Sequence, residues 1–343
     1  MAPLIAGRSR SRQGGGTREE SLAIEASRGA KIDGDGRQAV IGRMREVRIS
    51  AYAKINLRLD IAGKRADGFH ELRTILQTIS LHDDLRLRAV HGAEITLKIT
   101  GDEPLAGEPV QKNLVYRAVA AARRKLKIRR GVEIELKKTI PAGRGLGGGS
   151  SDAAAALLGY LRLTRRKLAP AQLLEIAASL GADVPFFLFG GRALGVNKGD
   201  EIYPLPDIAK QHLLVVSPRE IHVPTRDAYR WLKAKRLGLT KPAENPKLWG
   251  FCALCWGKQG SRLSNDFERP VFRRHPRLGQ IKRILLQRGA AEASLAGSGS
   301  AVFGVFPSPA MARRAADGFP HDQTFVCETI SREGYARLMR TAG

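Results

Sequence analysis

Apolar and polar residues alternate along the first strongly patterned part of the chain. From Ile55 to Ile61 every second residue is apolar, and Asn56, Arg58 and Asp60 lie between them. A period of two predicts a half-buried β-strand, within a pattern that begins at Val47. Runs of similar character predict further strands at 85–90, 94–100 and 132–139.

Helices are predicted where a capping or proline signal precedes a helical run. Asn113 can cap a helix that extends to about Lys127, and Pro170 suits the first turn of a helix that ends at Gly181. A further helical run covers 152–163. In the second half, strands are predicted at 212–217, 302–306 and 324–330, and helices at 225–236, 276–288 and 309–316.

This mixed order of strands and helices, with hairpins, predicts an α+β enzyme with two domains. Pro204 and Pro206 place the boundary near residue 205, so the domains cover 44–205 and 206–343. Residues 1–43 are rich in Gly, Arg and Ser and lack an apolar period, which predicts a disordered extension. Acidic residues in this stretch argue against a transit peptide, and Met44 is an alternative start.

Composition narrows the class of protein. The 343 residues are 43% hydrophobic. They contain no run of about 18 apolar residues, so we expect no membrane span. Three cysteines are too few for a disulfide framework and fit a reducing cytoplasm. Cys252 and Cys255 have the spacing of a redox or zinc motif, but no second pair follows, so we expect them to pack beside Trp249 and Trp256.

The chain is also strongly basic. Its net charge is +25, and residues 1–43 hold 8 Lys and Arg against 5 Asp and Glu, which leaves +22 on the rest. Such a body attracts polyanions, for example nucleotides, nucleic acid or acidic lipid. Charge alone does not identify a site, so an inert basic surface fits equally well.

The segment Pro141–Ser151 carries the most chemical information. Five glycines and two serines lie between the strand predicted at 132–139 and the helix predicted at 152–163. Glycines let the backbone approach a ligand and turn several N–H groups toward one point. The helix that follows adds free amides and the positive end of its dipole. Together these features predict a phosphate-binding loop.

Other glycine-rich loops fit less well. The spacing Gly143-x-Gly145-x-x-Gly148 matches a dinucleotide fingerprint, but no acidic residue lies in 160–174 to hold a ribose. A Walker loop would end in Gly-Lys-Ser or Gly-Lys-Thr, and a protein kinase would carry HRD and DFG motifs. Neither pattern is present.

The segment 141–154 resembles the phosphate-binding motif of the GHMP kinase superfamily. Residues 53–57 (AKINL) resemble the N-terminal motif of that superfamily, and residues 294–303 (SLAGSGSAVF) resemble its C-terminal glycine motif. Three more segments, 65–72 (RADGFHEL), 181–187 (GADVPFF) and 264–268 (SNDFE), resemble one group within it. That group acts in the methylerythritol phosphate route to isoprenoid precursors.

The resemblance implies both a fold and a reaction. The fold has a ribosomal protein S5 domain 2-like N-terminal domain and a ferredoxin-like C-terminal domain, with the active site between them. The reaction is ATP-dependent phosphorylation of the C2 hydroxyl of a cytidine diphosphate-linked methylerythritol. A cytoplasmic enzyme with this small-molecule substrate is expected, as a monomer or homodimer, without a nucleic acid or membrane partner.

Two residues are implied as the catalytic pair. By resemblance Asp183 is the general base that removes the proton of the hydroxyl, and Lys54 is its electrostatic partner. Taken alone, Asp183 would be a turn residue and Lys54 a surface lysine. Asn56 points to the same strand face as Lys54 and is a candidate for binding the substrate hydroxyl.

The same resemblance implies the two binding sites. Phe69 and His70 would hold the cytosine, with Phe69 in place of the more usual tyrosine, and Thr225 and Tyr229 would contact the same substrate. Mg²⁺ is expected to be carried by ATP, with Ser151 as a candidate contact and no dedicated carboxylate cage. The residues expected to bind ATP are Lys138, Pro141, Ala142, Gly143, Arg144, Gly145, Leu146, Gly147, Gly148, Gly149, Ser150 and Ser151.

Two other functions remain open on the sequence. A sibling kinase for homoserine, mevalonate or a sugar would share the glycine loop and would not need Phe69 or His70. A non-catalytic nucleic-acid binder would account for the +22 charge, but it would leave the glycine loop, Lys54 and Asp183 without a role.

Overall fold

The computed structural model describes residues 46–232 and 263–341. They belong to one compact unit, Arg45–Gly343. The predicted extension of residues 1–43, the alternative start Met44, and Cys252 and Cys255 all lie outside the described residues.

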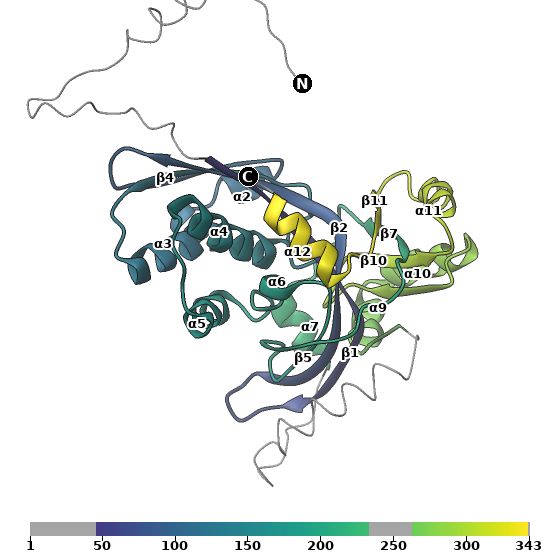
Figure 1. Cartoon of the computed structure of the whole chain (residues 1–343). Coiled ribbons are helices and arrows are strands. Elements are labelled where there is room, and N and C mark those ends of the chain that lie inside the picture. The colour runs from purple at the N-terminus through teal and green to yellow at the C-terminus, as the bar shows by residue number, and fades with distance from the viewer. Residues whose placement is uncertain (1–45, 233–262, 342–343) are drawn as a thin grey trace, which may run out of the picture. The chain divides into compact units, whose positions relative to one another are not determined.

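A seven-stranded sheet forms the first layer of the fold, in the order β3-β4-β2-β1-β8, with β5 and β6 added beside β2. Figure 1 shows that its centre is the long antiparallel pair β1 and β2. The strands of this sheet are β1 (Glu46–Lys64), β2 (His70–Val90), β3 (Ile95–Thr100), β4 (Gly131–Lys137), β5 (Arg192–Val196), β6 (Glu201–Pro204) and β8 (Ser264–Asn265).

Helices cover one face of this sheet and bury the largest apolar core. Alanines of α4 pack there against leucines and isoleucines of β1 and β2. Tyr335 and Met339 of the last helix join the same core, although they lie far away in the sequence. The helices that follow or flank the sheet strands are α2 (Glu103–Ala106), η2 (Val110–Lys112), α3 (Leu114–Leu126), α4 (Gly148–Thr164), α5 (Pro170–Leu180), α6 (Phe186–Phe189) and α12 (Arg332–Thr341).

The second sheet has four antiparallel strands in the order β11-β7-β10-β9. Numbered along the chain, this is the order 4-1-3-2 with helices in the two crossovers, which is the ferredoxin-like arrangement that we expected. Its elements are β7 (His212–Ser217), α7 (Thr225–Leu232), α9 (Glu268–Arg274), α10 (Pro276–Gln287), β9 (Glu292–Leu295), β10 (Val302–Phe306), α11 (Pro309–Ala316) and β11 (Gln323–Glu328).

The α+β fold class is confirmed, and most predicted elements are present. The strand predicted at 85–90 is longer and begins at His70, and the helix predicted at 152–163 begins earlier, at Gly148. The described elements that were not predicted are strands β5, β6, β8 and β9 and helices α2, η2, α6, α9 and α12. The domain boundary near residue 205 stays a prediction, although β6 ends at Pro204 and the smaller sheet begins at His212.

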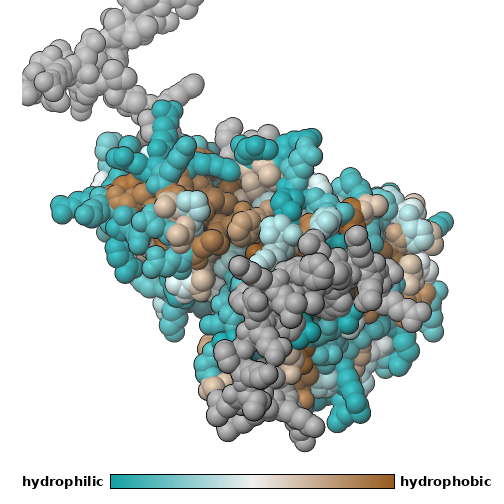
Figure 2. Space-filling view, turned by 60° about the horizontal axis from the view of Figure 1, so that its bottom comes forward, coloured by the Kyte–Doolittle hydropathy of each residue, from teal (hydrophilic) through white to brown (hydrophobic). Residues whose placement is uncertain are grey.

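The face drawn in Figure 2 is largely hydrophilic, with one larger apolar patch and several smaller ones apart from it. Within the described ranges, no helix has both the length and the apolar character that crossing a bilayer would require.

Candidate active site

The glycine loop Pro141–Ser151 runs from the end of β4 to the first turn of α4. Gly143, Gly145 and Gly147 have φ values of +65°, +80° and +73°, in the left-handed region that favours glycine. A Cβ on Gly145 would lie only 1.9 Å from the carbonyl oxygen of Ala296. The loop is therefore tightly packed against the second glycine motif, and the first amides of α4 remain free for a ligand.

Strand β1 presents Lys54 and Asn56 on one face, as the strand period predicted. Lys54 is only 3% exposed. Its Nζ donates a hydrogen bond to Asn56 Oδ1 over 2.8 Å and lies 3.6 Å from Asp183 Oδ2. Asn56 in turn donates to the hydroxyl of Thr74 over 2.7 Å. Lys54 and Asp183, which are distant in the sequence, therefore form an ion pair.

Both glycine motifs approach Lys54. The Lys54 backbone N–H donates to the Leu146 carbonyl over 2.9 Å. A Cβ on Gly147 would lie 3.0 Å from Lys54 Cγ, and one on Gly297 would lie 3.4 Å from Lys54 Nζ. The three segments of the superfamily resemblance thus meet around Lys54.

Asp183 lies in the turn between α5 and α6, with its side chain 37% exposed. It is open to a ligand on one side and held by Lys54 on the other. Burial raises the pKa of the Tyr229 hydroxyl, and the nearby negative charge of Asp183 raises it further. Tyr229, on α7, is therefore a neighbour of the Lys54–Asp183 pair.

Aromatic rings continue from Asp183 toward the loop that joins β1 and β2. The rings of His70 and Tyr229 stack with their centroids 4.6 Å apart. Burial, followed by the charge of Lys64, lowers the pKa of His70, which favours the neutral imidazole. Phe69 is 57% exposed, and the ammonium of Lys198 lies 4.8 Å from the centroid of its ring.

Thr225 links the predicted acceptor site to the second glycine motif. Its hydroxyl lies 3.1 Å from the hydroxyl of Ser298. Asn265 holds the same motif from below by donating to the carbonyl oxygens of Leu295 and Gly297, each over 2.8 Å. The segment 264–268 therefore supports the glycine motif.

Lys138, predicted to bind ATP, is placed differently from the loop residues. Its buried ammonium lies 2.5 Å from Asp83 Oδ2 and 2.7 Å from Asp152 Oδ2. Asp83 also accepts the backbone N–H groups of Thr139 and Ile140. Lys138 thus joins β2, the start of the glycine loop and α4. A direct contact with ATP stays a prediction.

Sequence reasoning missed several residues that shape the site. Asp83 is one, because an aspartate in a strand reads as a solvent-facing residue; its position in the alternation of Ile79, Leu81, Leu85 and Leu87 was the available signal. Arg144 was expected to touch ATP, but its side chain also ties the two glycine motifs together. It donates to the Ser300 hydroxyl over 2.9 Å and to the Arg219 carbonyl over 3.0 Å.

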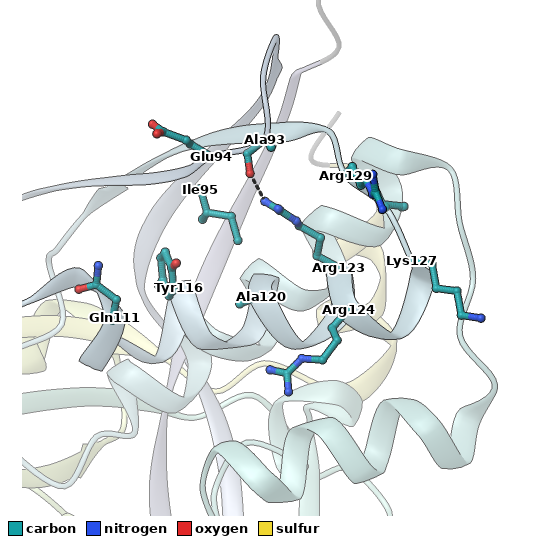
Figure 3. A pocket seen from close by; sticks show the side chains of 11 residues that line it. Ala93, Glu94, Ile95, Gln111, Tyr116, Ala120, Arg123, Arg124, Lys127 and Arg129 are labelled. Carbon is teal, nitrogen blue, oxygen red and sulfur yellow. Dashed lines mark hydrogen bonds between the residues drawn. The ribbon is translucent and has the colours of Figure 1, made fainter.

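The described residues contain no group of three or more His, Cys, Asp and Glu that could hold a metal ion. A cavity of about 930 Å³ lies elsewhere, along α3 and beside the start of β3 (Figure 3). None of the predicted catalytic or binding residues lines it.

Comparisons with known proteins identify the family of the chain. Residues 113–191 match the model of the GHMP kinases N terminal domain, and residues 250–322 match the GHMP kinases C terminal model. A 4-diphosphocytidyl-2-C-methyl-D-erythritol kinase of Solibacter usitatus is 43% identical over 87% of this chain and 93% of its own length. One of Pelotomaculum thermopropionicum is 40% identical over 82% of this chain and 97% of its own length.

Solved structures show the same relationship. A crystal structure of 4-(cytidine 5'-diphospho)-2C-methyl-D-erythritol kinase has a TM-score of 0.66 and 33% identity, covering 82% of this chain and 98% of that one. A homoserine kinase from Cytophaga hutchinsonii has a TM-score of 0.60 at 21% identity, covering 84% of this chain and 96% of that one, and so shares the fold. The chain belongs to the GHMP kinase family, in the group of the 4-diphosphocytidyl-2-C-methyl-D-erythritol kinases.

Proposed function

We propose that this chain transfers the γ-phosphoryl group of ATP to the C2 hydroxyl of 4-diphosphocytidyl-2-C-methyl-D-erythritol, giving the 2-phosphate and ADP. This step belongs to the non-mevalonate route to isoprenoid precursors. The observation that carries the proposal is the Lys54–Asp183 pair, 3.6 Å apart, where the two glycine motifs meet.

Asp183 is the proposed general base. An alcohol is a weak nucleophile, so its proton must leave as the phosphoryl group arrives. The exposed side of Asp183 can reach that hydroxyl, while Lys54 on its other side favours the ionised carboxylate. Asn56, already bonded to Lys54, is proposed to orient the hydroxyl.

The glycine loop is the proposed ATP site, in which residues 141–151 hold the phosphates through backbone N–H groups. Ser151 is a candidate for a contact to the phosphates or to their Mg²⁺, because it is a buried residue of the loop whose hydroxyl has no hydrogen-bond partner within the described residues. Mg²⁺ carried by ATP would neutralise charge on the phosphates. Lys54 adds a buried cation beside the loop, and the ammonium of Lys138 lies on its other side, 3.2 Å from where a Cβ on Gly148 would stand.

The cytidine part of the substrate is proposed to lie against the aromatic rings of Phe69, His70 and Tyr229. Aromatic faces stack on a base, and a neutral imidazole offers one donor and one acceptor to its edge. Thr225, which is bonded to Ser298, would contact the same substrate beside the second glycine motif.

One assay tests this proposal. The full chain is incubated with ATP, Mg²⁺ and each candidate acceptor, namely the diphosphocytidyl alcohol, homoserine and mevalonate, and ADP and phosphorylated product are measured. We expect turnover with the first alone. Turnover only with another acceptor would reject the proposed substrate in favour of a sibling kinase.

A variant then tests the catalytic pair. We expect Asp183→Asn to lower kcat by about 10²- to 10⁴-fold, the usual contribution of a general base, with little change in the KM for ATP. Asp317→Asn, at the end of α11 and remote in sequence from every predicted site residue, is the matched control and should leave kcat unchanged. A loss of fold in Asp183→Asn, seen by circular dichroism, would remove this support.

A further inference from the structure

A second feature of the molecule has no part in the proposed reaction. Nine cations gather where α3 and α4 end, and we call this set the basic end. Eight of them are exposed, and Arg123 is partly buried. The basic end consists of Arg123, Arg124, Lys125, Lys127, Arg129, Arg130, Arg165, Arg166 and Lys167.

These residues are brought together because α3 and α4 pack side by side in the same direction. A Cβ on Gly149, in the first turn of α4, would lie 3.9 Å from Leu114, the first residue of α3. Farther along, burial raises the pKa of Tyr160 on α4, and the positive charge of Arg123 on α3 opposes that shift. Both helices therefore begin at the glycine loop and end away from it.

The basic end is poor in compensating charge. Among the described residues, Lys125 has a carboxylate partner, Glu175, at 3.4 Å, and no ion pair involves the other eight. The negative ends of two helix dipoles, each roughly half a charge, offset about one of the nine cations. Helix capping alone therefore does not account for the set, and the surface carries a large uncompensated positive potential.

The cavity of about 930 Å³ runs along α3, from Tyr116 in the first turn of that helix to Arg123, Arg124, Lys127 and Arg129 of the basic end, and Glu94 is the acidic residue that lines it. Figure 3 shows that the cationic side chains fan out from its rim instead of converging, with Arg123 directed at the Ala93 carbonyl. A small anion needs converging donors, whereas an extended chain of phosphates needs cations spread along its path.

We infer that the basic end binds a single-stranded nucleic acid, with phosphates along the cations and a base entering the cavity against Tyr116. Aromatic rings beside arginines are the usual platform for unpaired bases, and six of the nine cations are arginines, which pair with phosphate through two hydrogen bonds. A flat lipid surface would reach the rim and not the cavity. This function is additional to the proposed kinase activity, because the nine cations lie at the far ends of α3 and α4 from the glycine loop, and Tyr116, in the first turn of α3, is not among the residues proposed to bind ATP.

The test is a titration of a fluorescein-labelled 15-nucleotide RNA with the full chain at several KCl concentrations, in the presence of saturating ATP and Mg²⁺. We expect binding whose log K falls with log salt, with a slope near −3 for about four phosphates on a single strand. The variant Arg124→Gln/Arg129→Gln/Arg166→Gln should bind about tenfold or more weakly, with the slope reduced by about 2.

Matched variants test whether RNA binding depends on the basic end or only on the net positive charge of the chain. Arg273→Gln/Arg283→Gln/Arg313→Gln removes three exposed cations from α9, α10 and α11, and should lower binding much less. Tyr116→Leu should weaken binding about fivefold with an unchanged salt slope, because stacking is uncharged. Kinase turnover should be the same in all three variants.

Several results would overturn the inference. They are no binding by the unaltered chain at 10-fold molar excess and low salt, equal losses in the two triple variants, or displacement of the RNA by ATP. Binding to phosphatidylglycerol vesicles that depends on the basic end, without binding to RNA, would assign the surface to a membrane instead.

Discussion

At the scale of single residues, Lys54 shows how a buried cation is tolerated. An ammonium removed from water must be paired, and here a carboxylate and an amide oxygen both face it. The two partners differ in exposure, since Asn56 is buried and Asp183 is open on one side. The same contacts that make Lys54 acceptable in the fold therefore leave the carboxylate available to a ligand.

Lys198 lies against Phe69, one of the residues proposed to hold the cytosine. Its ammonium lies over one face of the Phe69 ring, at 4.8 Å from the centroid, and 3.8 Å from Asp200. A cation on one face steadies the ring and leaves the other face for a base. A cation–π contact at an exposed ring is worth about 0.5–1 kcal/mol.

We therefore expect Lys198→Met to raise the KM for the diphosphocytidyl substrate about two- to fivefold, with kcat and the KM for ATP unchanged, in steady-state assays. Lys198→Arg should restore most of the affinity, because a guanidinium also stacks on aromatic rings. Lys98→Met, an exposed lysine on β3, is the control. An equal change in the KM for ATP would contradict a role at the Phe69 ring.

At the scale of elements, the helices and strands with a regular local sequence pattern were the ones that could be predicted. The alternation in β1 and the glycines before α4 predicted both elements because period and turn chemistry are local properties. The part of β2 before residue 85 was not predicted, and it contains Asp83, a charged residue in an otherwise alternating apolar pattern. Asp83 is buried only because Lys138 and two backbone N–H groups meet it there, and no local pattern shows such partners.

The residues of the candidate site also divide into those that local motifs predict and those that only the fold brings together. Lys54 and Asp183 could be named from motifs, but the stacking of His70 on Tyr229 and the bond from Arg144 to Ser300 join segments far apart in the sequence. Helix α12 was missed for a related reason. Its short segment is mainly polar. It is held to the larger sheet by Tyr335 and Met339, which are buried in the core of that sheet.

The glycine loop provides a matched pair of substitutions. Gly145→Ala should lower the free energy of unfolding by about 1–3 kcal/mol, because its φ is +80° and the new Cβ would meet the Ala296 carbonyl at 1.9 Å. Gly149→Ala should raise it by about 0.5–1 kcal/mol, because this residue is helical and its nearest neighbour is 3.9 Å away. Urea unfolding measures both, and a tolerated Gly145→Ala would show that the loop is not packed as described.

The Lys138 cluster predicts a dependence of stability on pH. Burial raises the pKa of Asp152 above its ordinary value of 3.8, against the opposing charge of Lys138. The folded chain therefore binds this proton more tightly than the unfolded chain does. The contribution of Asp152 to stability falls as the pH rises above about 4, by at most about 1.4 kcal/mol per pH unit for one proton.

Asp152→Asn removes this titration while keeping the shape of the side chain. Relative to the unaltered chain, we expect its stability to improve between pH 5 and pH 8 in urea unfolding experiments. Lys138→Met is the contrasting variant, because it leaves two buried carboxylates without their cation and should cost about 3–5 kcal/mol. Parallel stability curves for Asp152→Asn and the unaltered chain would contradict the prediction.

At the scale of the whole molecule, the two sheets are interlocked by the order of the chain. After the last strand of the smaller sheet, the chain returns to the larger sheet as α12 and buries Tyr335 beside Tyr52. Strand β8, which lies between α7 and α9 in the chain, pairs with β1 of the larger sheet. Neither sheet has a core completed by a continuous stretch of sequence.

This interlocking predicts that residues 46–341 unfold as one cooperative unit. Tyr335 is 3% exposed, and its hydroxyl donates to the Phe187 carbonyl over 2.6 Å. Tyr335→Ala should therefore cost about 3–5 kcal/mol, and Tyr335→Phe about 1 kcal/mol for the lost hydrogen bond. In differential scanning calorimetry both variants should shift one transition to lower temperature in that order. If Tyr335→Ala instead split the transition and left an upper peak unmoved, the smaller sheet would be stable without α12, and the two sheets would unfold independently.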